Sequence, residues 1–239
     1  MNKTNIRKTI ICIAAAFAAI SCHLDDTLYY NNLTMGNVVE GRFVSDQGNT
    51  FNVVEQIGSE NLAIEKRVML LCDVLNATKG QSNEYDVRLR TFSRVLTKEP
   101  VAIENAAEGD IAAQDPVHID QLWFAGGYIN MVIKTHSQPN SEVKHLINLV
   151  YSKGENGEYI LNLRHNAFGE VINKTEPQLV LTGGAYVSFP ISEIIKEDKA
   201  KIVLNWKWYE TNDFSFNYEK EKNYSFEYEW ERKGFIQKK

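Results

Sequence analysis

Apolar residues recur at every second position along most of this chain, which is the period of a half-buried β-strand. Stretches of this kind extend from about Val38 to Val95 and again from about Val117 to Arg232. Turn-forming residues, such as those at 47–49 and 126–127, separate the stretches. Helix signals are scarce and amount to one short helical turn at residues 192–198. The pattern therefore predicts a mainly β protein.

The first series of stretches predicts a small OB-like β-barrel domain, residues 37–103. Two segments, 38–46 and 50–56, flank the turn at 47–49, and a run that is apolar on both faces follows at 67–76. An alternating strand at 85–95 completes four or five strands in about 65 residues, which suits a closed or partly closed barrel. Cys72 shares a row of the apolar run with Leu70 and Val74, so we expect it to be buried as a small hydrophobe.

The second series predicts an antiparallel β-sandwich domain, residues 104–239. Segment 98–116, which mixes acids, small residues and two prolines, is predicted to connect the two domains. Near the end of the chain Tyr224, Phe226, Tyr228 and Trp230 share one face of a strand, and glutamates occupy the other face. We interpret this aromatic row as one wall of the sandwich core. A platform on which sugars stack is the alternative.

The first 21 residues have the features of a signal peptide. Three basic residues precede an apolar run of eleven residues, Ile10–Ile20, and signal-peptide cores span about 7 to 15 residues. Because a transmembrane helix needs about 20 apolar residues, the run is too short to remain in a bilayer. The sequence Ala19-Ile20-Ser21-Cys22 resembles a bacterial lipobox, in which Cys22 becomes the lipidated first residue of the mature protein. The alternative is an ordinary secretory signal that leaves Cys22 as a spare thiol.

Cysteine content and charge narrow the options. Cys12 lies in the signal peptide and Cys22 would carry lipid, so of three cysteines only Cys72 remains in the folded part. No intramolecular disulfide is then possible, and stability has to come from burial. Without the three basic residues of the signal peptide the chain has 23 basic and 31 acidic residues, a formal net charge of −8. This sign argues against a protein that binds nucleic acid or an anionic membrane surface.

Several segments together resemble the NigD-like family of Bacteroidetes lipoproteins. In the second domain they are residues 115–119 (DPVHI), Trp123, 126–130 (GGYIN), 144–150 (KHLINLV), 163–167 (LRHNA) and 185–192 (AYVSFPIS). In the first domain they are residues 41–51 (GRFVSDQGNTF) and 86–98 (DVRLRTFSRVLTK). The resemblance implies a lipoprotein signal, an OB-type barrel and a β-sandwich in this order. It also implies a cell-envelope protein, for which a role in bacteriocin immunity has been suggested, and it supplies no active site.

The resemblance also predicts where in the cell the protein is located. We expect a lipid-anchored protein of the outer membrane, with residues 22–36 as a polar tether between the anchor and the fold. Asp25 and Asp26 resemble the surface-export signal of lipoproteins in this bacterial group. The alternative, solvated tether charge, leaves the periplasmic face open. Asp26-Thr27-Leu28 also resembles the O-glycosylation triplet of the same group, which would place a glycan on Thr27.

Two histidines carry the strongest enzymatic alternative. His145 and His165 each stand in line with apolar residues of a predicted strand. If those strands pair, the two imidazoles could bind a metal together with Asp115 or His118. The other interpretation is that each histidine interrupts a core row and forms local hydrogen bonds. No HExxH, CxxC or GxSxG motif occurs, so we expect neither a bound metal nor a cofactor.

One strand of the barrel offers a candidate ligand-binding face. With Val87 and Leu89 toward the core, Arg88, Arg90, Phe92 and Arg94 are predicted to share the opposite face. Guanidinium groups suit carboxylates and acidic sugars; the alternative is a solvated face paired with acids such as Glu40. We therefore predict a non-enzymatic envelope lipoprotein that binds or assembles with a protein or glycan partner. A histidine-dependent metal protein or hydrolase is the alternative function.

Overall fold

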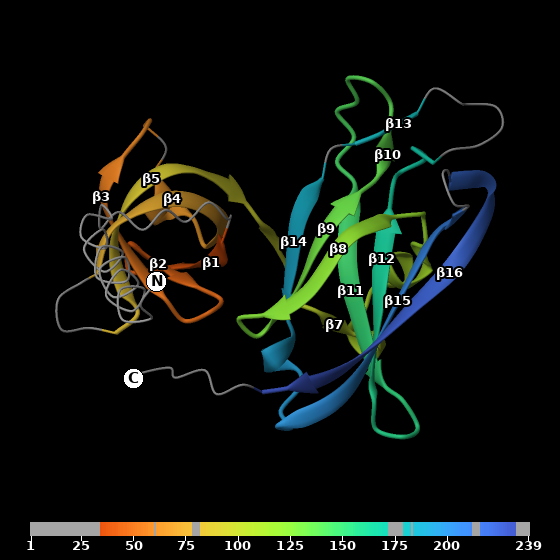
Figure 1. Ribbon diagram of the computed structural model, residues 1–239. Helices are drawn as coiled ribbons and strands as arrows, with labels where there is room; N and C mark the ends of the chain where they lie inside the picture. Colours follow the sequence, from red (N-terminus) through yellow and green to blue (C-terminus); the bar gives the residue numbers. More distant parts are fainter. Residues whose placement is uncertain are drawn as a thin grey trace, which may run out of the picture.

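The computed structural model describes residues 34–59, 61–77, 82–171, 179–182, 184–211 and 216–232. Most of these residues lie in strands. One group of strands forms a closed barrel, and beside it two sheets that face each other form a sandwich (Figure 1). The structure confirms the predicted fold class, a mainly β chain with a small barrel followed by a β-sandwich. The predicted signal peptide, the predicted lipidation site Cys22 and the predicted glycosylation site Thr27 lie outside the described residues.

The barrel consists of five strands in the order β1-β2-β3-β5-β4. Their bounds are β1 Thr34–Val39, β2 Arg42–Ser45, β3 Thr50–Gln56, β4 Arg67–Ala77 and β5 Glu84–Arg94, and a short 3-10 helix, η1, covers Leu62–Ile64. Strands β3 and β5 pair in parallel and the other neighbours are antiparallel. The interior is filled by alternate residues of these strands, among them Phe43, Phe51, Leu70, Val74, Val87 and Leu89. As predicted, Cys72 is buried there, with 2% of its surface exposed.

Two details of the barrel differ from the sequence prediction. The segment expected as one strand, 38–46, is divided at Glu40 and Gly41, which both adopt positive φ and turn the chain from β1 into β2. Strand β1 also begins at Thr34, inside the predicted tether, because residues 34–37 pair with β4 and help to close the barrel.

The sandwich has a five-stranded sheet in the order β16-β15-β12-β11-β7 and a four-stranded sheet in the order β6-β14-β9-β8. In the first sheet β7 is Val101–Ala102, β11 Leu146–Lys153, β12 Tyr159–Asn166, β15 Lys199–Thr211 and β16 Phe216–Glu231. In the second sheet β6 is Leu96–Thr97, β8 His118–Ala125, β9 Tyr128–Lys134 and β14 Ala185–Pro190. A small sheet pairs β10, His136–Ser137, with β13, Val180–Leu181. The short helices are η2 Ile103–Asn105, α2 Glu108–Ala112 and η3 Ile191–Glu193.

Sheet pairing refines the predicted sandwich. Strands β6 and β7, which the sequence prediction counted with the barrel, instead extend the edges of the two sandwich sheets. Most neighbours are antiparallel, but the pairs β6–β14, β7–β11 and β12–β15 are parallel. None of the helices in the described ranges is long and apolar enough to cross a bilayer.

The core of the sandwich lies between its two sheets. Its fully buried members include Ile129, Met131, Leu149, Leu161, Phe189 and Leu204. Of the predicted aromatic row on β16, Trp230 is buried and Tyr228 packs against the core, whereas Phe226 remains 40% exposed. The row therefore lines the core at one end of β16 and reaches solvent toward its middle.

Candidate functional site

The arginines of the predicted barrel face are all paired with carboxylates. Arg88 Nε lies 2.6 Å from Glu55 Oε2, Arg90 Nε 2.8 Å from Asp73 Oδ1, and Arg94 Nε 2.9 Å from Glu65 Oε1. The acids lie on β3, on β4 and in the loop that precedes β4. Because most of these side chains are substantially exposed, each pair contributes only a few tenths of a kcal/mol, up to about 1 kcal/mol. The face is thus electrically balanced and not a bare cationic surface.

The predicted grouping of Phe92 with these arginines is wrong. Its ring packs against the barrel core, together with Tyr85 and Val53. The cause is a β-bulge, at which Leu71 pairs with Thr91 while Cys72 pairs with Leu89. Arg90 is left as the extra residue, so the inside–outside alternation reverses after it and Phe92 turns inward. Arg94 follows in the same row as Phe92, opposite Val68, and reaches solvent at the end of the barrel, where 75% of its side chain is exposed.

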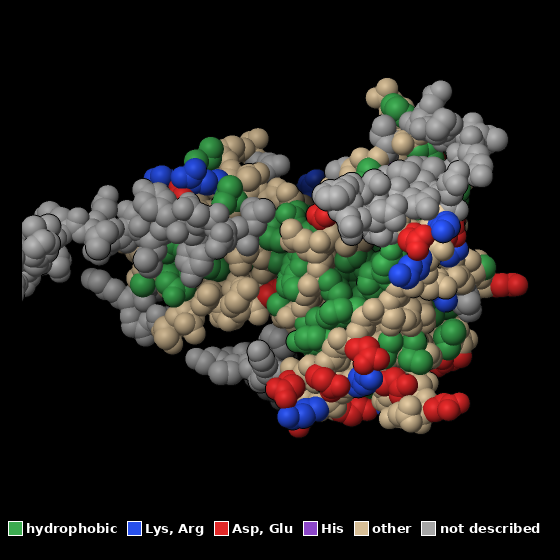
Figure 2. All heavy atoms as spheres, turned by 45° about the vertical axis from the view of Figure 1, so that its right-hand side comes forward, with side chains coloured by type: hydrophobic (Ala, Val, Ile, Leu, Met, Phe, Trp, Pro, Cys, Tyr) green, Lys and Arg blue, Asp and Glu red, His purple; other side chains and the backbone are tan. Residues whose placement is uncertain are grey.

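Exposed aliphatic side chains accompany the ion pairs on the barrel. Val54, which precedes Glu55, and Ile57, two residues after it, are 57% and 58% exposed. Ile64, which precedes Glu65, is 72% exposed. Figure 2 shows basic side chains gathered on the barrel with hydrophobic side chains beside them. We call this set of residues, Val54, Ile57, Ile64, Arg88, Arg90 and Arg94 with their acid partners, the barrel face; it includes the outer side of β3 and β5 and the adjoining end of the barrel, where Arg94 meets Glu65. Its mixture of aliphatic and arginine side chains is typical of protein contact surfaces.

The predicted histidine pair does form. Strands β11 and β12 pair so that Ile147 lies opposite His165, and this brings His145 beside it. The Nε2 of His165 lies 3.1 Å from Nδ1 of His145, and Nε2 of His145 lies 3.0 Å from Glu170 Oε2. At the other end Nδ1 of His165 lies 2.9 Å from the carbonyl oxygen of Pro116. A hydrogen-bonded chain thus runs from a carboxylate through two imidazoles to the backbone.

The hydrogen-bond partners at the two ends of this chain determine which ring nitrogens carry a proton. A carbonyl only accepts, so Nδ1 of His165 carries a proton, and burial together with the charge on His145 lowers the pKa of His165 to about 4. His165 is therefore neutral, its Nε2 accepts, and His145 donates from Nδ1. Burial alone would raise the pKa of Glu170, but hydrogen bonds from Ser141 and His145 lower it. This carboxylate lies 3.0 Å from Nε2 of His145 and closes the outer end of the hydrogen-bonded chain.

This arrangement leaves little room for metal chemistry. Every ring nitrogen of the two histidines already has a hydrogen-bond partner. Asp115, a predicted co-ligand, accepts the Ala167 amide at 2.7 Å, and His118 packs on Trp208 instead. In the part of the chain that the structure describes, no three residues of the types His, Cys, Asp and Glu gather where they could hold a metal ion. These hydrogen bonds link the end of β12 to residues 115–116.

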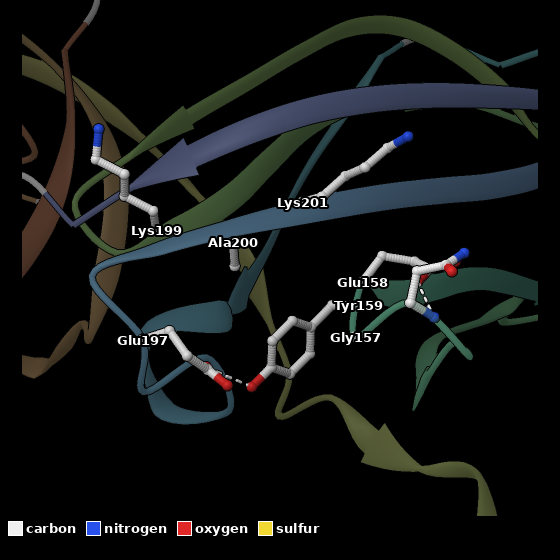
Figure 3. Close-up of a pocket in the computed structure, with 8 residues that line it drawn as sticks. Gly157, Glu158, Tyr159, Glu197, Lys199, Ala200 and Lys201 are labelled. Atoms are coloured by element: carbon white, nitrogen blue, oxygen red, sulfur yellow. Dashed lines mark hydrogen bonds between the residues drawn. The ribbon is translucent and has the colours of Figure 1, made fainter.

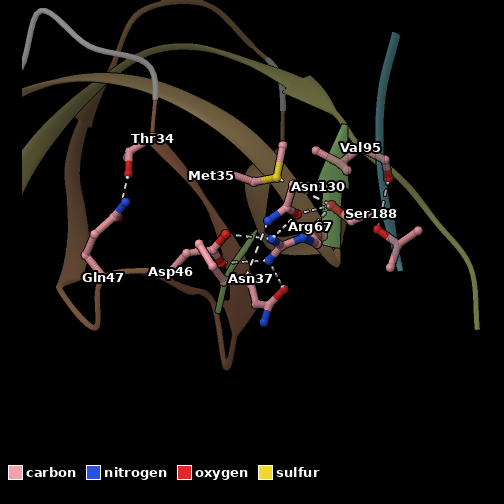
Figure 4. Close-up of polar contacts among 11 residues, drawn as sticks. Thr34, Met35, Asn37, Asp46, Gln47, Arg67, Val95, Asn130 and Ser188 are labelled. Carbon is pink, nitrogen blue, oxygen red and sulfur yellow. Dashed lines mark hydrogen bonds and ion pairs between the residues drawn. The ribbon is translucent and has the colours of Figure 1, made fainter. Parts of the chain in front are cut away.

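A buried polar cluster joins the barrel to the sandwich (Figure 4). At its centre Arg67, the first residue of β4, pairs with Asp46, and their side chains are only 1% and 2% exposed. Within the barrel the guanidinium donates to Asp46 Oδ1 at 2.9 Å, Asp46 Oδ2 at 2.7 Å and Asn37 Oδ1 at 3.0 Å. Toward the sandwich it donates to Asn130 Oδ1 at 2.9 Å and Ser188 Oγ at 3.0 Å. A guanidinium has five N–H donors, and here every one of them is used.

Neighbouring residues close the junction around this ion. The ring of Tyr128 lies beneath the guanidinium, with 3.8 Å between Arg67 Cζ and the ring centroid. Gly126, at φ +62°, approaches so closely that a Cβ there would lie 2.2 Å from Asp46 Oδ1. A small apolar cluster of Met35, Met69 and Val95, with Trp123 and Tyr186 packed on it, continues the contact. The two domains therefore share one desolvated interface.

A shallow hollow of about 250 Å³ lies between the β11–β12 turn and the start of β15 (Figure 3). Tyr159 donates to Glu197 Oε2 at 2.7 Å, and Lys153 Nζ lies 2.8 Å from Glu197 Oε1. These two hydrogen bonds lower the pKa of Glu197 to about 2. The polar groups here satisfy one another, and the arrangement ties η3 and its following loop to the hairpin.

Sequence reasoning missed the junction. The only sign in the sequence is an arginine at the start of an apolar run, residues 67–76. Its partners Asn130 and Ser188 are 63 and 121 residues away, and each belongs to a strand that looks ordinary by itself. Long-range polar pairs of this kind leave no periodic pattern.

Comparisons with known proteins agree with this architecture. Residues 99–228 match the family model of the NigD-like C-terminal beta sandwich domain. A protein from Bacteroides caccae described as a NigD-like immunity protein superposes with a TM-score of 0.61 at 17% identity, covering 84% of this chain and 99% of that chain. No curated protein is significantly similar to the chain.

Two further solved structures share the fold. One, from Parabacteroides distasonis and provisionally classed as toxin-related, has a TM-score of 0.55 at 22% identity and covers 82% of this chain and 91% of its own. The other, from Bacteroides fragilis and provisionally classed as a lipoprotein, has a TM-score of 0.53 at 14% identity, with coverages of 82% and 97%. At these identities the likeness establishes the fold only.

Proposed function

The chain belongs to the NigD-like family, and from that premise we propose that it is a non-enzymatic, lipid-anchored envelope protein that acts by binding a protein partner. The observation that carries the proposal is the junction between barrel and sandwich. Two domains that acted independently would need no fixed orientation relative to each other. A buried ion pair also adds little stability compared with apolar residues of the same size. A fully satisfied buried guanidinium does fix orientation, which matters when surfaces of both domains face one partner.

The barrel face is the proposed contact surface. Exposed aliphatic side chains such as Ile57 and Ile64 lose unfavourable contact with water when a partner covers them. Arginine–carboxylate pairs around them supply directional hydrogen bonds at the rim. Arg88, Arg90 and Arg94 of the predicted ligand-binding strand remain part of this proposal, whereas Phe92 does not, because its ring belongs to the barrel core.

The arrangement of nucleophiles and bases supports a binding role over catalysis. Burial, with Asp73 beside it, raises the pKa of Cys72 to about 11, so its thiol stays protonated and inert. His145 and His165 are engaged with each other and with internal partners. Metal analysis of the purified protein tests the alternative: stoichiometric zinc or manganese would favour a histidine-dependent metal protein or hydrolase.

The lipid anchor at Cys22 and residence in the outer membrane belong to the same proposal. They rest on the lipobox-like sequence at 19–22 and on the similarity to a provisionally classed lipoprotein from Bacteroides fragilis. Labelling with a radioactive or clickable fatty acid should mark the wild-type protein and not Cys22→Ala. Protease treatment of intact cells separates the outer surface, where the protein is cleaved, from the periplasmic face, where it is protected.

Protection against a bacteriocin is the second candidate function. It is favoured by the similarity to the Bacteroides caccae protein described as an immunity protein. A strain lacking this chain should become more sensitive to a bacteriocin, and wild type but not Cys22→Ala should restore resistance. If the deletion strain is no more sensitive to the bacteriocins of neighbouring strains, the immunity role is refuted and the proposal of partner binding remains.

Site-specific photo-crosslinking in intact cells tests the contact surface. A photoreactive amino acid replaces Ile57 or Ile64 on the barrel face, and in a matched control it replaces Val143, an exposed side chain of the sandwich at 45%. We expect one protein adduct of the same mass from both barrel positions and none from the control. Absence of adducts at both barrel positions, or the same adducts at Val143, would refute the barrel face as the contact surface.

A further inference from the structure

The five-stranded sheet opens where β12 and β15 separate. These parallel strands pair from Tyr159 with Ile202 as far as Asn162 with Asn205. Beyond that point residues 115–117 enter between them. The Asp115 amide donates to the His165 carbonyl at 2.9 Å, and the Val117 amide donates to the Lys207 carbonyl, also at 2.9 Å. The inserted segment thus donates one hydrogen bond to each strand and lies between them.

A hollow of about 290 Å³ lies at this opening, on the side of the sheet that faces away from the core. The side follows from alternation: Leu161 and Leu163 are buried in the core, so Asn162 and Arg164 point to the other face. The polar side chains around the hollow are Gln114, Asp115, Asn162, Arg164, Asn205, Lys207 and Asn223. Its size is near the lower end of small-molecule pockets, about 300 Å³ and upward, which suits a single ring.

Arg164 is a cation without a counter-ion. Its Nε is buried and has no hydrogen-bond partner, and among the described residues its guanidinium forms no ion pair. Burial alone accounts for the lowered pKa of this side chain, since no charged group contributes to the shift. Asn148, its cross-strand neighbour, already accepts a hydrogen bond from Lys98. A partly desolvated guanidinium with an unsatisfied N–H donor lowers the stability of the protein unless an anion binds to it.

The rest of the lining indicates which kind of anion fits. Asn162 and Asn205 join through one side-chain hydrogen bond of 3.4 Å, which leaves further amide donors and acceptors for a ligand. Lys207 lies at the rim, where its charge is balanced by Glu221 at 2.8 Å, and its ammonium group is a further hydrogen-bond donor. Asp115 adds a carboxylate, which repels a compact, highly charged anion such as phosphate but accepts hydrogen bonds from hydroxyl groups.

We propose that this hollow binds a carboxylated sugar ring, a hexuronate, with its carboxylate on Arg164 and its hydroxyl groups on the asparagines and Asp115. The guanidinium fork matches a carboxylate in two parallel hydrogen bonds. Amides and a carboxylate suit vicinal hydroxyls, which donate and accept at once. The site lies on the sandwich, apart from the barrel face, and its existence does not depend on the proposed protein partner.

Calorimetric titration of the full-length protein in a sugar-free detergent tests the site. Glucuronate is the probe, glucose supplies the hydroxyls without the carboxylate, and acetate supplies the carboxylate without the hydroxyls. We expect glucuronate to bind with a Kd below about 10 mM and each of the other two to bind at least about tenfold more weakly. A glucuronate-terminated oligosaccharide then separates the sources: tighter binding than the free sugar identifies the end of an acidic glycan.

Two variants locate the binding. Arg164→Gln should weaken glucuronate binding by about tenfold or more, since it removes the charged fork. Lys207→Gln, whose ion pair is at the rim, should weaken it by a smaller factor, and it serves if Arg164→Gln does not fold. The matched control is Arg42→Gln on the barrel, where the arginine is half exposed and its carboxylate lies 4.0 Å away. The proposal is overturned if glucuronate does not bind, if acetate or glucose binds as well, or if both hollow variants bind like the control.

Discussion

Replacing Arg67 by methionine should uncouple the barrel from the sandwich. Methionine keeps much of the aliphatic volume of the arginine stem but removes all five hydrogen-bond donors. The residues that bind Arg67 lose different amounts of hydrogen bonding. Asn130 Oδ1 still accepts the Ser188 hydroxyl at 2.6 Å, whereas Asp46, 2% exposed, is left as a buried carboxylate without its cation.

The expected cost follows from that buried carboxylate. Removing one partner of a buried ion pair costs about 3–5 kcal/mol, because the remaining charge stays desolvated. Loss of the contact between the buried guanidinium and the Tyr128 ring, 3.8 Å from the guanidinium carbon, adds up to about 2 kcal/mol. Against a total stability of about 5–15 kcal/mol for a domain, the perturbation is large. It acts mainly on the interface that both domains share.

Two spectroscopic probes separate the domains during urea unfolding. All four tryptophans, at 123, 206, 208 and 230, lie on strands of the sandwich. Their fluorescence therefore follows that domain and, through Trp123, its contact with the barrel, while far-ultraviolet circular dichroism follows both domains. The wild type should give coincident transitions. Arg67→Met should shift the transitions to lower urea and split them.

A double variant provides the control. Asp46→Leu combined with Arg67→Met removes both charges, and it should recover much of the lost stability, since an apolar replacement of a whole buried pair is often nearly neutral. If Arg67→Met instead unfolds within about 0.5 kcal/mol of the wild type with coincident transitions, the reasoning is refuted.

Three other predictions follow from single contacts. Gly126→Ala should destabilise by about 2 kcal/mol or more in thermal melts, because the residue has φ +62° and a Cβ would strike Asp46. Burial holds the pKa of His136 and of His165 at about 4; between pH 6.5 and 4 only the unfolded chain takes up these protons, so stability should fall as pH falls, by up to about 1.4 kcal/mol per pH unit for each histidine. Urea midpoints that stay constant over this range would contradict the burial of these rings. Cys72, with its pKa raised to about 11, should resist thiol reagents at pH 8 in the native state and react once urea unfolds the chain.

The sequence predicted what depends on local alternation and missed what depends on distant pairs. Period-two patterns located most strands, and they correctly placed Cys72 in the barrel core. The same rule failed at Phe92, because a bulge adds one residue and reverses every later side chain. The meeting of His145 and His165 was predictable only on the condition that their strands pair, which they do.

The junction between the domains and the hollow at Arg164 lie beyond such local rules. Arg67 meets Ser188 across 121 residues of sequence, and the hollow at Arg164 exists because residues 115–117 separate two strands that pair elsewhere. No periodicity within one strand encodes either event. Both require the finished packing of elements that are far apart in the chain.

The segments that carry the family resemblance acquire a physical meaning from this packing. Residues 126–130 supply Gly126 against Asp46, Tyr128 beneath Arg67, and Asn130 as an acceptor. Residues 185–192 supply Ser188, and residues 41–51 supply Asp46 itself. Segments 115–119, 144–150 and 163–167 supply the hydrogen-bonded chain from Pro116 through the two histidines. These sequences therefore build the orientation of two domains and the end of one sheet, and it follows that similarity in them reports a shared shape more directly than a shared ligand. The surfaces proposed for binding, the barrel face and the hollow at Arg164, are the places where chains of this shape can differ in what they recognise.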